Sequence, residues 1–236
     1  MIEIREFDDV SDRELVSAWR ALDGVGACPS LFASHTWLSV WSRHFAGSCA
    51  PSLLAGYESG IPIGLAPLFV SRRGVAELPV NFLSLRSEFM FVEGRGGEFV
   101  EAALRHLRRS GRALVLRNLP ADSPSHRALA QRSRPAGYFR GESASRVTPY
   151  VDTSRAWDDY LAHIPKKRVA RWQRRARKLE RHAGMRICSY DEQVDVEALV
   201  DAVIDVDSRS WREGEGTSIR GRGLGEFFRE SCGAMA

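Results

Sequence analysis

Hydrophobic and polar residues alternate or recur along the first 45 positions in a way that predicts one strand and two helices. Residues 2–7 alternate well enough for a short strand. Asp12 and Ser34 stand where a side chain caps a helix, so we expect helices from each cap to Leu22 and Phe45. Their apolar residues recur at spacings of three and four, and these are Leu15, Ala18, Trp19, Leu22, Trp37, Leu38, Val40, Trp41 and Phe45. Trp37 and Trp41 predict core packing, with a stacking platform for a ligand as the alternative.

The next segment predicts a β-hairpin followed by further strands and helices. Residues 51–58 and 62–70 are both strand-like, and Ser59-Gly60 between them is a turn signal. Pro62 and Pro67 have no backbone donor, which indicates an edge strand or a bulge. Further elements are expected in the order strand 78–92, helix 98–109, buried strand 113–119, helix 124–133 and strand 147–153. Strands alternating with helices predict an α/β or α+β fold built on a layered sheet.

Helical patterns dominate the rest of the chain. Ser154 is expected to cap a helix with Asp158 and Asp159 in its first turn, and Pro165 to end it. A basic helix should then run to about His182, with one apolar stripe that packs, formed by Val169, Trp172, Ala176 and Leu179. A strand is expected at 185–190, a long helix at 194–211 and a final helix at 226–236, the last two separated by the turn-rich segment 213–225.

Positive charge is concentrated in one of these helices. The chain has 236 residues and a net charge of +4, and Lys166 to Arg181 contains nine Lys or Arg against one acid, Glu180. A cationic patch attracts phosphates, nucleic acid or anionic lipid. Helical spacing places four of these cations on one face, and we predict an anion-binding surface formed by Lys167, Arg171, Arg174 and Arg175. The alternative is a solvated helix face without a ligand.

Composition excludes several classes of protein. No apolar run approaches the roughly 18–20 residues that cross a bilayer, and the first residues lack the pattern of a secretory signal. The four cysteines, Cys28, Cys49, Cys188 and Cys232, are widely spaced, which indicates neither a metal site nor a disulfide framework and favours a cytoplasmic location. The six histidines fall in no recognisable nucleophile motif, so no catalytic residue is assigned. Glu88 is an acid that either lines a cleft or serves the structure.

Several segments, in this order, resemble one family: WRAL at 19–22, 32–45, the hairpin at 57–73, 148–184 and 208–219. Together they look like the CelD-like, Fem-related branch of the GNAT acyltransferases, which is associated with cellulose or other exopolysaccharide biosynthesis. The resemblance implies a tandem architecture of GNAT-like mixed sheets flanked by helices. Residues 1–150 would be the N-terminal half, and residues 151–236 the beginning of a C-terminal half that looks incomplete.

The resemblance implies an N-acyltransferase that moves an acyl group from acyl-CoA, such as acetyl-CoA, to an amine or amino-sugar acceptor in exopolysaccharide or cell-envelope biosynthesis. The alternatives are a Fem-like aminoacyl transferase that uses aminoacyl-tRNA and a non-catalytic GNAT-like binding module. DNA is not expected as a partner, and no cofactor should be tightly bound.

GNAT enzymes hold the CoA pyrophosphate on backbone N–H groups at a glycine-rich helix start. The one match to that family pattern is residues 220–225, which makes Arg220, Arg222, Gly223 and Gly225 the candidate cofactor-binding residues. A buried strand should precede such a turn, and residues 211–219 are too polar for one. An ordinary loop is therefore the alternative, and acyl-CoA is expected to bind this chain weakly or not at all.

Overall fold

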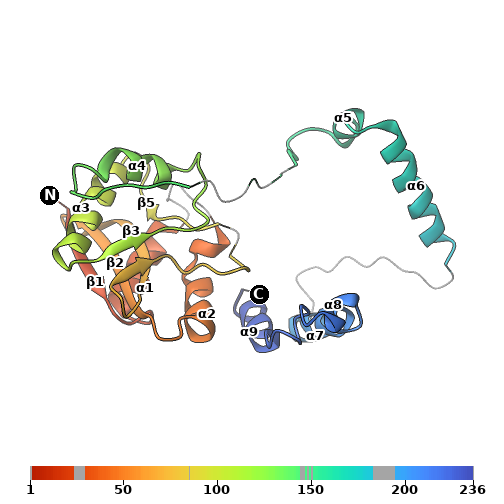
Figure 1. Ribbon diagram of the computed structural model, residues 1–236, viewed down its shortest axis with the longest axis horizontal. Helices are drawn as coiled ribbons and strands as arrows, with labels where there is room; N and C mark the ends of the chain where they lie inside the picture. Colours follow the sequence, from red (N-terminus) through yellow and green to blue (C-terminus); the bar gives the residue numbers. More distant parts are fainter. Residues whose placement is uncertain are drawn as a thin grey trace. The chain divides into compact units, whose positions relative to one another are not determined.

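The computed structural model describes residues 2–23, 30–84, 86–143, 147, 149, 151–182 and 195–235. The chain forms two compact units, one made of residues 1–143 and 195–236 and the other of residues 144–194 (Figure 1). The predicted boundary between two halves at about residue 150 stays a prediction. Each unit is described by itself below.

The first unit is built on a mixed, open sheet. Its strands are β1 (Glu3–Phe7), β2 (Ala50–Glu58), β3 (Ile61–Val70), β4 (Val75–Glu77), β5 (Met90–Phe91) and β6 (Ala113–Val115). They lie in the order β1-β2-β3-β4-β6, and β5 also pairs with β3. The β4–β6 pair is parallel and the other pairs are antiparallel. A mixed sheet flanked by helices, as the sequence predicted, is therefore confirmed.

The predicted hairpin is confirmed. In the turn between β2 and β3, Ser59 has φ 50° and Gly60 has φ 80°, so both residues adopt the left-handed backbone conformation. A two-residue turn with two positive φ angles has the twist that matches paired strands. Glycine adopts this conformation without steric cost, which explains why the signal Ser59-Gly60 is found here.

Pro62 and Pro67 of β3 lie where the sheet needs no backbone N–H donor. The interpretation of this strand as an edge strand is nevertheless wrong. β3 is an interior strand, with β2 on one side and β4 and β5 on the other. Pro62 lies at the register shift opposite Gly56 and Tyr57, so the bulge interpretation is confirmed. The Ile63 carbonyl accepts a hydrogen bond from the Val92 N–H, so the backbone polar groups of Ile63 point toward β5. The backbone groups of alternate residues in a strand point to the same side, so the nitrogen of Pro67, four residues further along, also points toward this side. There it lies between the stretches of β3 that pair with β5 and with β4.

The first two helices begin at the predicted caps. α1 (Arg13–Leu22) starts where Asp12 Oδ1 accepts from the backbone N–H of Glu14 and Leu15 at 2.8 and 3.1 Å. A short turn, η1 (Leu31–Ala33), leads to α2 (His35–Phe45), which Ser34 caps through Trp37 N at 3.2 Å. Both caps satisfy donors that a helix start leaves free.

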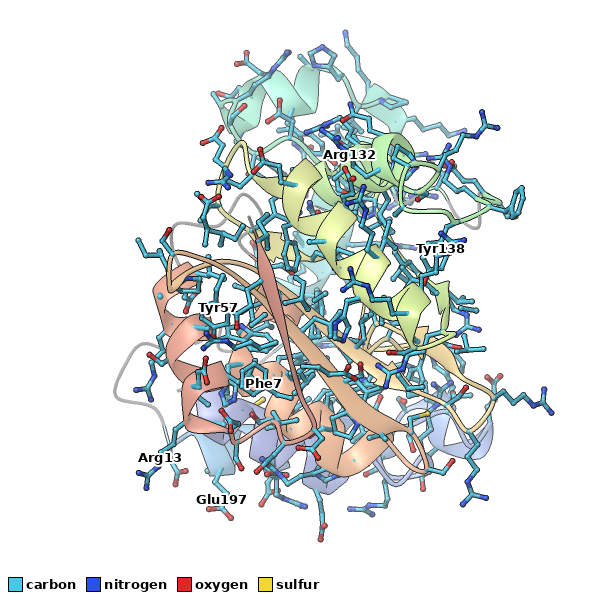
Figure 2. All side chains as sticks on the ribbon, turned by 90° about the vertical axis from the view of Figure 1, so that its left-hand side faces the viewer. Phe7, Arg13, Tyr57, Arg132, Tyr138 and Glu197 are labelled. Atoms are coloured by element: carbon cyan, nitrogen blue, oxygen red, sulfur yellow. The ribbon has the colours of Figure 1, made fainter. Side chains whose placement is uncertain are left out.

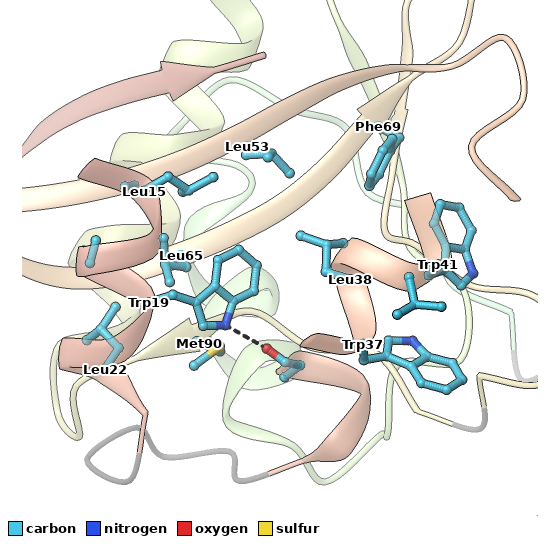
Figure 3. Packing of buried hydrophobic residues seen from close by; sticks show 14 of the residues in the cluster. Leu15, Trp19, Leu22, Trp37, Leu38, Trp41, Leu53, Leu65, Phe69 and Met90 are labelled. Atoms are coloured by element: carbon cyan, nitrogen blue, oxygen red, sulfur yellow. Dashed lines mark hydrogen bonds between the residues drawn. The ribbon is translucent and has the colours of Figure 1, made fainter. Parts of the chain in front are cut away.

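α1 and α2 cover one face of the sheet with a core rich in tryptophan. Trp19 Nε1 donates to the Ala33 carbonyl at 2.9 Å, which ties α1 to η1 (Figure 3). Trp37 and Trp41 are buried against this core, as predicted, and the Trp41 ring lies 5.2 Å from that of Phe69 on β3. The buried sheet residues on this face are Leu53, Ala55, Tyr57, Leu65, Phe69 and Met90.

The other face of the sheet is covered by α3 (Gly96–Arg109) and α4 (Pro124–Arg132), both predicted helices. Leu54, Ala66 and Leu68 point to this side, in alternation with the residues of the first core. Gly56 and Gly64 are paired across β2 and β3, and the Phe99 ring of α3 lies over both. A Cβ at either position would lie 2.6 or 2.5 Å from a ring carbon, so only glycine admits Phe99 at this distance.

Two predicted strands are wrong for most of their length. In the described part of 78–92, the strand is limited to Met90–Phe91, and Val92 adds a single bridge residue. Pro79 has no donor, and Asn81 Oδ1 accepts from the N–H of Leu83 and Ser84, which closes a local turn instead of a ladder. The predicted buried strand at 113–119 is only Ala113–Val115, and it lies at the edge of the described sheet, with Val115 exposed.

Three helices near the end of the chain belong to the first unit: α7 (Val196–Ser208), α8 (Trp211–Gly214) and α9 (Gly225–Met235). The long helix predicted to Trp211 ends at Ser208, because Ser210 caps the separate helix α8 through Arg212 N. α9 packs against α2, where the Phe227 ring lies 5.5 Å from Trp37 and 4.8 Å from Phe45. His44 Nε2 and Glu230 Oε2 are 2.7 Å apart beside these rings.

The second unit contains α5 (Trp157–Ala162) and the basic helix α6 (Lys166–Glu180). Ser154 is not the cap of α5, because its hydroxyl donates to Asp152 at 2.6 Å and Ala156 precedes the helix. Pro165 ends the first helix segment and precedes α6, as predicted. The strand predicted at 185–190 lies outside the described residues. The strand predicted at 147–153 is wrong for its described residues, 147, 149 and 151–153, and its other two residues lie outside the described part of the chain.

The apolar stripe of α6 does not pack as predicted. No residue of α6 is buried, and Trp172 and Leu179 are 37% and 51% exposed. Helical periodicity identifies the stripe but contains no information about whether another element covers it.

The contact between Phe99 and the paired glycines generates the first prediction. Gly64→Ala should lower the free energy of unfolding by about 1–3 kcal/mol, because its methyl group overlaps the ring. Gly233→Ala in α9, where a Cβ meets no heavy atom within 4 Å, should instead be neutral or stabilise by up to about 1 kcal/mol. Urea unfolding measures both. If Gly64→Ala costs as much in a Phe99→Ala background as in the native chain, the ring is not the reason for the glycine.

Burial of the tryptophans generates the second prediction. Trp37→Ala should cost about 3–5 kcal/mol of unfolding free energy, because the ring fills the core between α2 and α9. The control is Trp211→Ala, at a side chain that is 71% exposed, and it should change stability by less than about 0.5 kcal/mol. A loss below about 1 kcal/mol for Trp37→Ala would favour the ligand-platform interpretation.

Candidate functional site

The basic face of α6 concentrates positive charge, since Lys166 to Arg181 contains nine Lys or Arg against one acid. Lys167, Arg171, Arg174 and Arg175 are all exposed on a continuous helix, so the spacing that predicted a common face is realised. None of the four makes an ion pair with an Asp or Glu in the part of the chain that the structure describes. Their charge is therefore available to an anion, and the assignment of that anion stays a prediction.

The start of α6 adds to this positive potential. Lys166, Lys167 and Arg168 occupy the first turn, which contains no acid, and no side chain caps the helix. The partial positive charge of a helix N-terminus makes cations unfavourable there. An anion bound beside this turn would remove that repulsion. Exposed aromatic rings lie in the same unit, namely Trp172 on α6 and Trp157, which stacks on Tyr160 at 5.3 Å.

The glycine-rich segment 220–225 forms a closed turn before α9. Gly221 N donates to the Ser218 hydroxyl at 2.8 Å and Arg222 N to the Ser218 carbonyl at 3.0 Å. Gly223 N and Leu224 N donate to the carbonyls of Arg220 and Ile219, both at 2.9 Å. Four successive amides are thus used within the turn and do not point at a ligand.

The other groups of this turn also have local roles. Gly223 has φ +67°, which favours glycine, and the Arg222 guanidinium lies 4.7 Å from the centre of the Phe82 ring. Arg220 is exposed, and Gly225 begins α9. The segment before the turn is α8 and not a buried strand. A role for these residues in holding a CoA pyrophosphate stays a prediction, for which the amides at the start of α9 are the remaining donors.

A second glycine-rich helix start, which the sequence analysis missed, lies between β5 and α3. It does follow a buried strand, and the signal was Gly94-Arg95-Gly96-Gly97 after strand-like residues. The structure explains two of its glycines without a ligand. Gly94 has φ +78°, which favours glycine, and a Cβ on Gly96 would overlap the Phe91 ring. Arg95 bonds Glu58 and Glu98, each at 2.8 Å. These carboxylates oppose a bound phosphate here.

A polar cluster joins β1, β2 and α3 around Glu6, and no sequence pattern predicts it. Ser52 Oγ donates to Glu6 Oε1 at 2.7 Å, Arg112 Nη1 donates to the same oxygen at 2.5 Å, and His106 Nε2 lies 2.7 Å from Oε2. Burial raises the pKa of Glu6, but hydrogen bonds from His106, Arg112 and Ser52 outweigh it and lower the pKa to about 2.

This cluster is not arranged for nucleophilic catalysis. A serine nucleophile needs a base on its hydroxyl, and here Ser52 bonds the carboxylate while His106 bonds the other oxygen of the same group. Ser52 is also fully buried. The cluster holds the sheet to α3.

Glu88, His35 and His126 have structural partners. Glu88 is buried and its Oε1 accepts from Arg86 Nε at 2.5 Å, in agreement with the structural interpretation of this acid. His35 Nε2 lies 2.9 Å from the Val10 carbonyl, and His126 Nε2 lies 2.8 Å from Glu142. Within the described ranges, no group of three His, Cys, Asp or Glu could hold a metal ion.

The comparisons with known proteins assign no family. No protein-family model matches the chain, and no curated protein sequence matches it. The resemblance to the GNAT acyltransferases therefore stays a prediction. Among the described helices, none has both the length and the apolar composition needed to span a bilayer.

The Glu6 cluster generates the third prediction. The lowered pKa means that the ionised carboxylate stabilises the fold above its usual pKa of 4.5, and that this stabilisation is lost as the pH falls toward 2. Glu6→Gln should therefore destabilise the protein at pH 7, with a difference from the native chain that shrinks between pH 4.5 and 2. Thermal unfolding across this range measures it, and Glu215→Gln, at an exposed acid without a described ion pair, is the control. A difference that stays constant with pH would contradict the assignment.

Proposed function

We propose that this chain binds acyl-CoA weakly, through α6, and takes part in GNAT-type transfer of the acyl group from acyl-CoA to an amine or amino-sugar acceptor. The observation that carries the proposal is the exposed face of α6, whose four cations have no carboxylate partner among the described residues. Acyl-CoA is a suitable ligand because its reactive thioester is joined to several phosphate groups, which arginine binds well.

The fold is consistent with the proposal. In the first unit, β1, the β2–β3 hairpin and the shorter strands form a mixed, open sheet with helices on its faces, and a mixed sheet flanked by helices is what the resemblance implies. Fold alone does not define an activity, so this agreement is supporting evidence only.

The reaction itself makes limited demands on the protein. The acceptor amine attacks the thioester carbonyl, a C–N bond forms, the C–S bond breaks, and the amine proton leaves as the CoA thiol is released. A base that accepts this proton and donors that stabilise the developing oxyanion accelerate the step. No residue of the chain is assigned to either role.

A Fem-like aminoacyl transferase is the second candidate, and the exposed Trp172 among the arginines of α6 favours it. Aromatic rings stack on unpaired bases, and cations contact the RNA backbone. Binding of tRNA would weaken steeply with salt, in proportion to the number of phosphates contacted.

A non-catalytic binding module is the third candidate. The internally bonded amides of residues 221–224 favour it, because they leave that turn few donors for a pyrophosphate.

Calorimetry with acetyl-CoA tests the proposal and generates the fourth prediction. Reversal of two charges, Arg171→Glu with Arg175→Glu, should weaken binding at least about tenfold, because both cations lie on the exposed face of α6. The matched control is Arg13→Glu with Arg20→Glu, which reverses two exposed cations of α1 without an ion pair among the described residues (Figure 2 labels Arg13) and should leave affinity unchanged.

Three outcomes would contradict the proposal. They are absence of acetyl-CoA binding, equal losses in the two charge-reversed variants, and tight, salt-sensitive binding of tRNA that acetyl-CoA does not displace. The last outcome would support the second candidate. Circular dichroism of each variant establishes that it is folded.

A further inference from the structure

A hollow of about 390 Å³ lies beside the C-terminal part of α3. It is lined by Arg105, Arg108, Arg109, Pro135 and Ala136. Arg108 and Arg109 stand three and four residues after Arg105, so the three arginines share a face of the helix. The segment that follows α4 forms the opposite wall, and Figure 2 shows its flanking residues Arg132 and Tyr138 beside α3.

The charge of this hollow is positive. Arg105 is paired with Glu101 at 2.5 Å, and Glu101 also accepts from Arg132 at 3.1 Å. Arg108 and Arg109 make no ion pair with any carboxylate in the described part of the chain. Of the three arginines that line the hollow, two thus have no carboxylate partner among the described residues, and the third shares its carboxylate with Arg132.

The Arg108 guanidinium lies close to the backbone of the opposite wall. Gly137 has φ +85°, and a Cβ at this position would overlap the guanidinium of Arg108. The conformation favours glycine, and the absent side chain is what makes room for the cation. Tyr138 fixes the end of the segment, since its N–H donates to the Ser133 carbonyl and its hydroxyl to the Arg112 carbonyl, both at 2.9 Å.

We infer that this hollow binds a phosphate monoester of a small molecule. Guanidinium groups bind phosphate oxygens in pairs of parallel hydrogen bonds, and Arg108 and Arg109 have no competing carboxylate. Pro135 and Ala136 supply an apolar wall for the organic part of the ligand, and the volume is in the range of small-molecule sites. The hollow shares no residue with α6, so binding here is separable from the binding of acyl-CoA.

The test uses glucose 6-phosphate, inorganic phosphate and glucose as probes in calorimetry at low ionic strength. Glucose 6-phosphate should bind with at least about tenfold higher affinity than inorganic phosphate, and glucose should not bind. Arg108→Gln with Arg109→Gln should lower the affinity for glucose 6-phosphate at least about tenfold. The control is Arg72→Gln with Arg73→Gln, two adjacent exposed arginines of the β3–β4 turn without a described ion pair, and it should bind as the native chain does.

Backbone amide NMR locates the ligand independently, since the signals of residues 136–138 should shift on addition of glucose 6-phosphate. Absence of binding, or equal losses in the two double variants, would overturn the assignment of the site. Equal affinities for inorganic phosphate and glucose 6-phosphate would overturn the role of the apolar wall. Shifts confined to residues 166–182 would place the phosphate on α6 instead.

Discussion

The first unit depends on the contact between one aromatic ring and two paired glycines. Gly56 and Gly64 stand opposite each other on β2 and β3, and together they leave a depression in the sheet that the Phe99 ring fills. Close packing of this kind determines both how near α3 lies to the sheet and how it is rotated about its axis. A side chain at either glycine position would push the whole of α3 away from the sheet, and not only Phe99.

The position of α3 in turn defines the polar features at its two ends. At its start, Arg95 reaches Glu58 on the hairpin, and near its end His106 reaches Glu6 on β1. Two residues further along, Arg108 lies close to the backbone at Gly137. These contacts lie on different sides of the helix, so each constrains its rotation. The arginine-lined hollow is thus a consequence of how the hydrophobic residues of α3 pack, although none of its charged groups belongs to the core.

Local signals in the sequence predicted local structure well. The caps Asp12 and Ser34 and the turn at Ser59-Gly60 each act within four residues, and each is confirmed. The strand predicted at 78–92 failed because the amide side chain of Asn81 closes a turn that hydrophobic periodicity does not register. The apolar stripe of α6 was identified, but its exposure depends on what lies opposite, which is not a local property.

The candidate sites divide in the same way. The common face of Lys167, Arg171, Arg174 and Arg175 follows from helical spacing alone, so the sequence sufficed to find it. The Glu6 cluster and the hollow beside α3 join residues that are distant in the chain, such as Glu6 with Arg112 and Arg108 with Gly137. One sequence contains no signal for such pairs, because each member is an ordinary surface residue in its own segment.

The packing of α9 on α2 has a consequence for synthesis of the protein. A ribosome releases α2 long before Phe227, and domains begin to fold while the chain is still being made. Until α9 emerges, Trp37 and Phe45 lack the ring that covers them, and the nascent chain presents an aromatic surface to its surroundings. Exposed apolar patches of this kind are where newly made chains associate with one another or with chaperones. A helix that is synthesised late, α9, therefore covers aromatic residues of α2, which is synthesised much earlier.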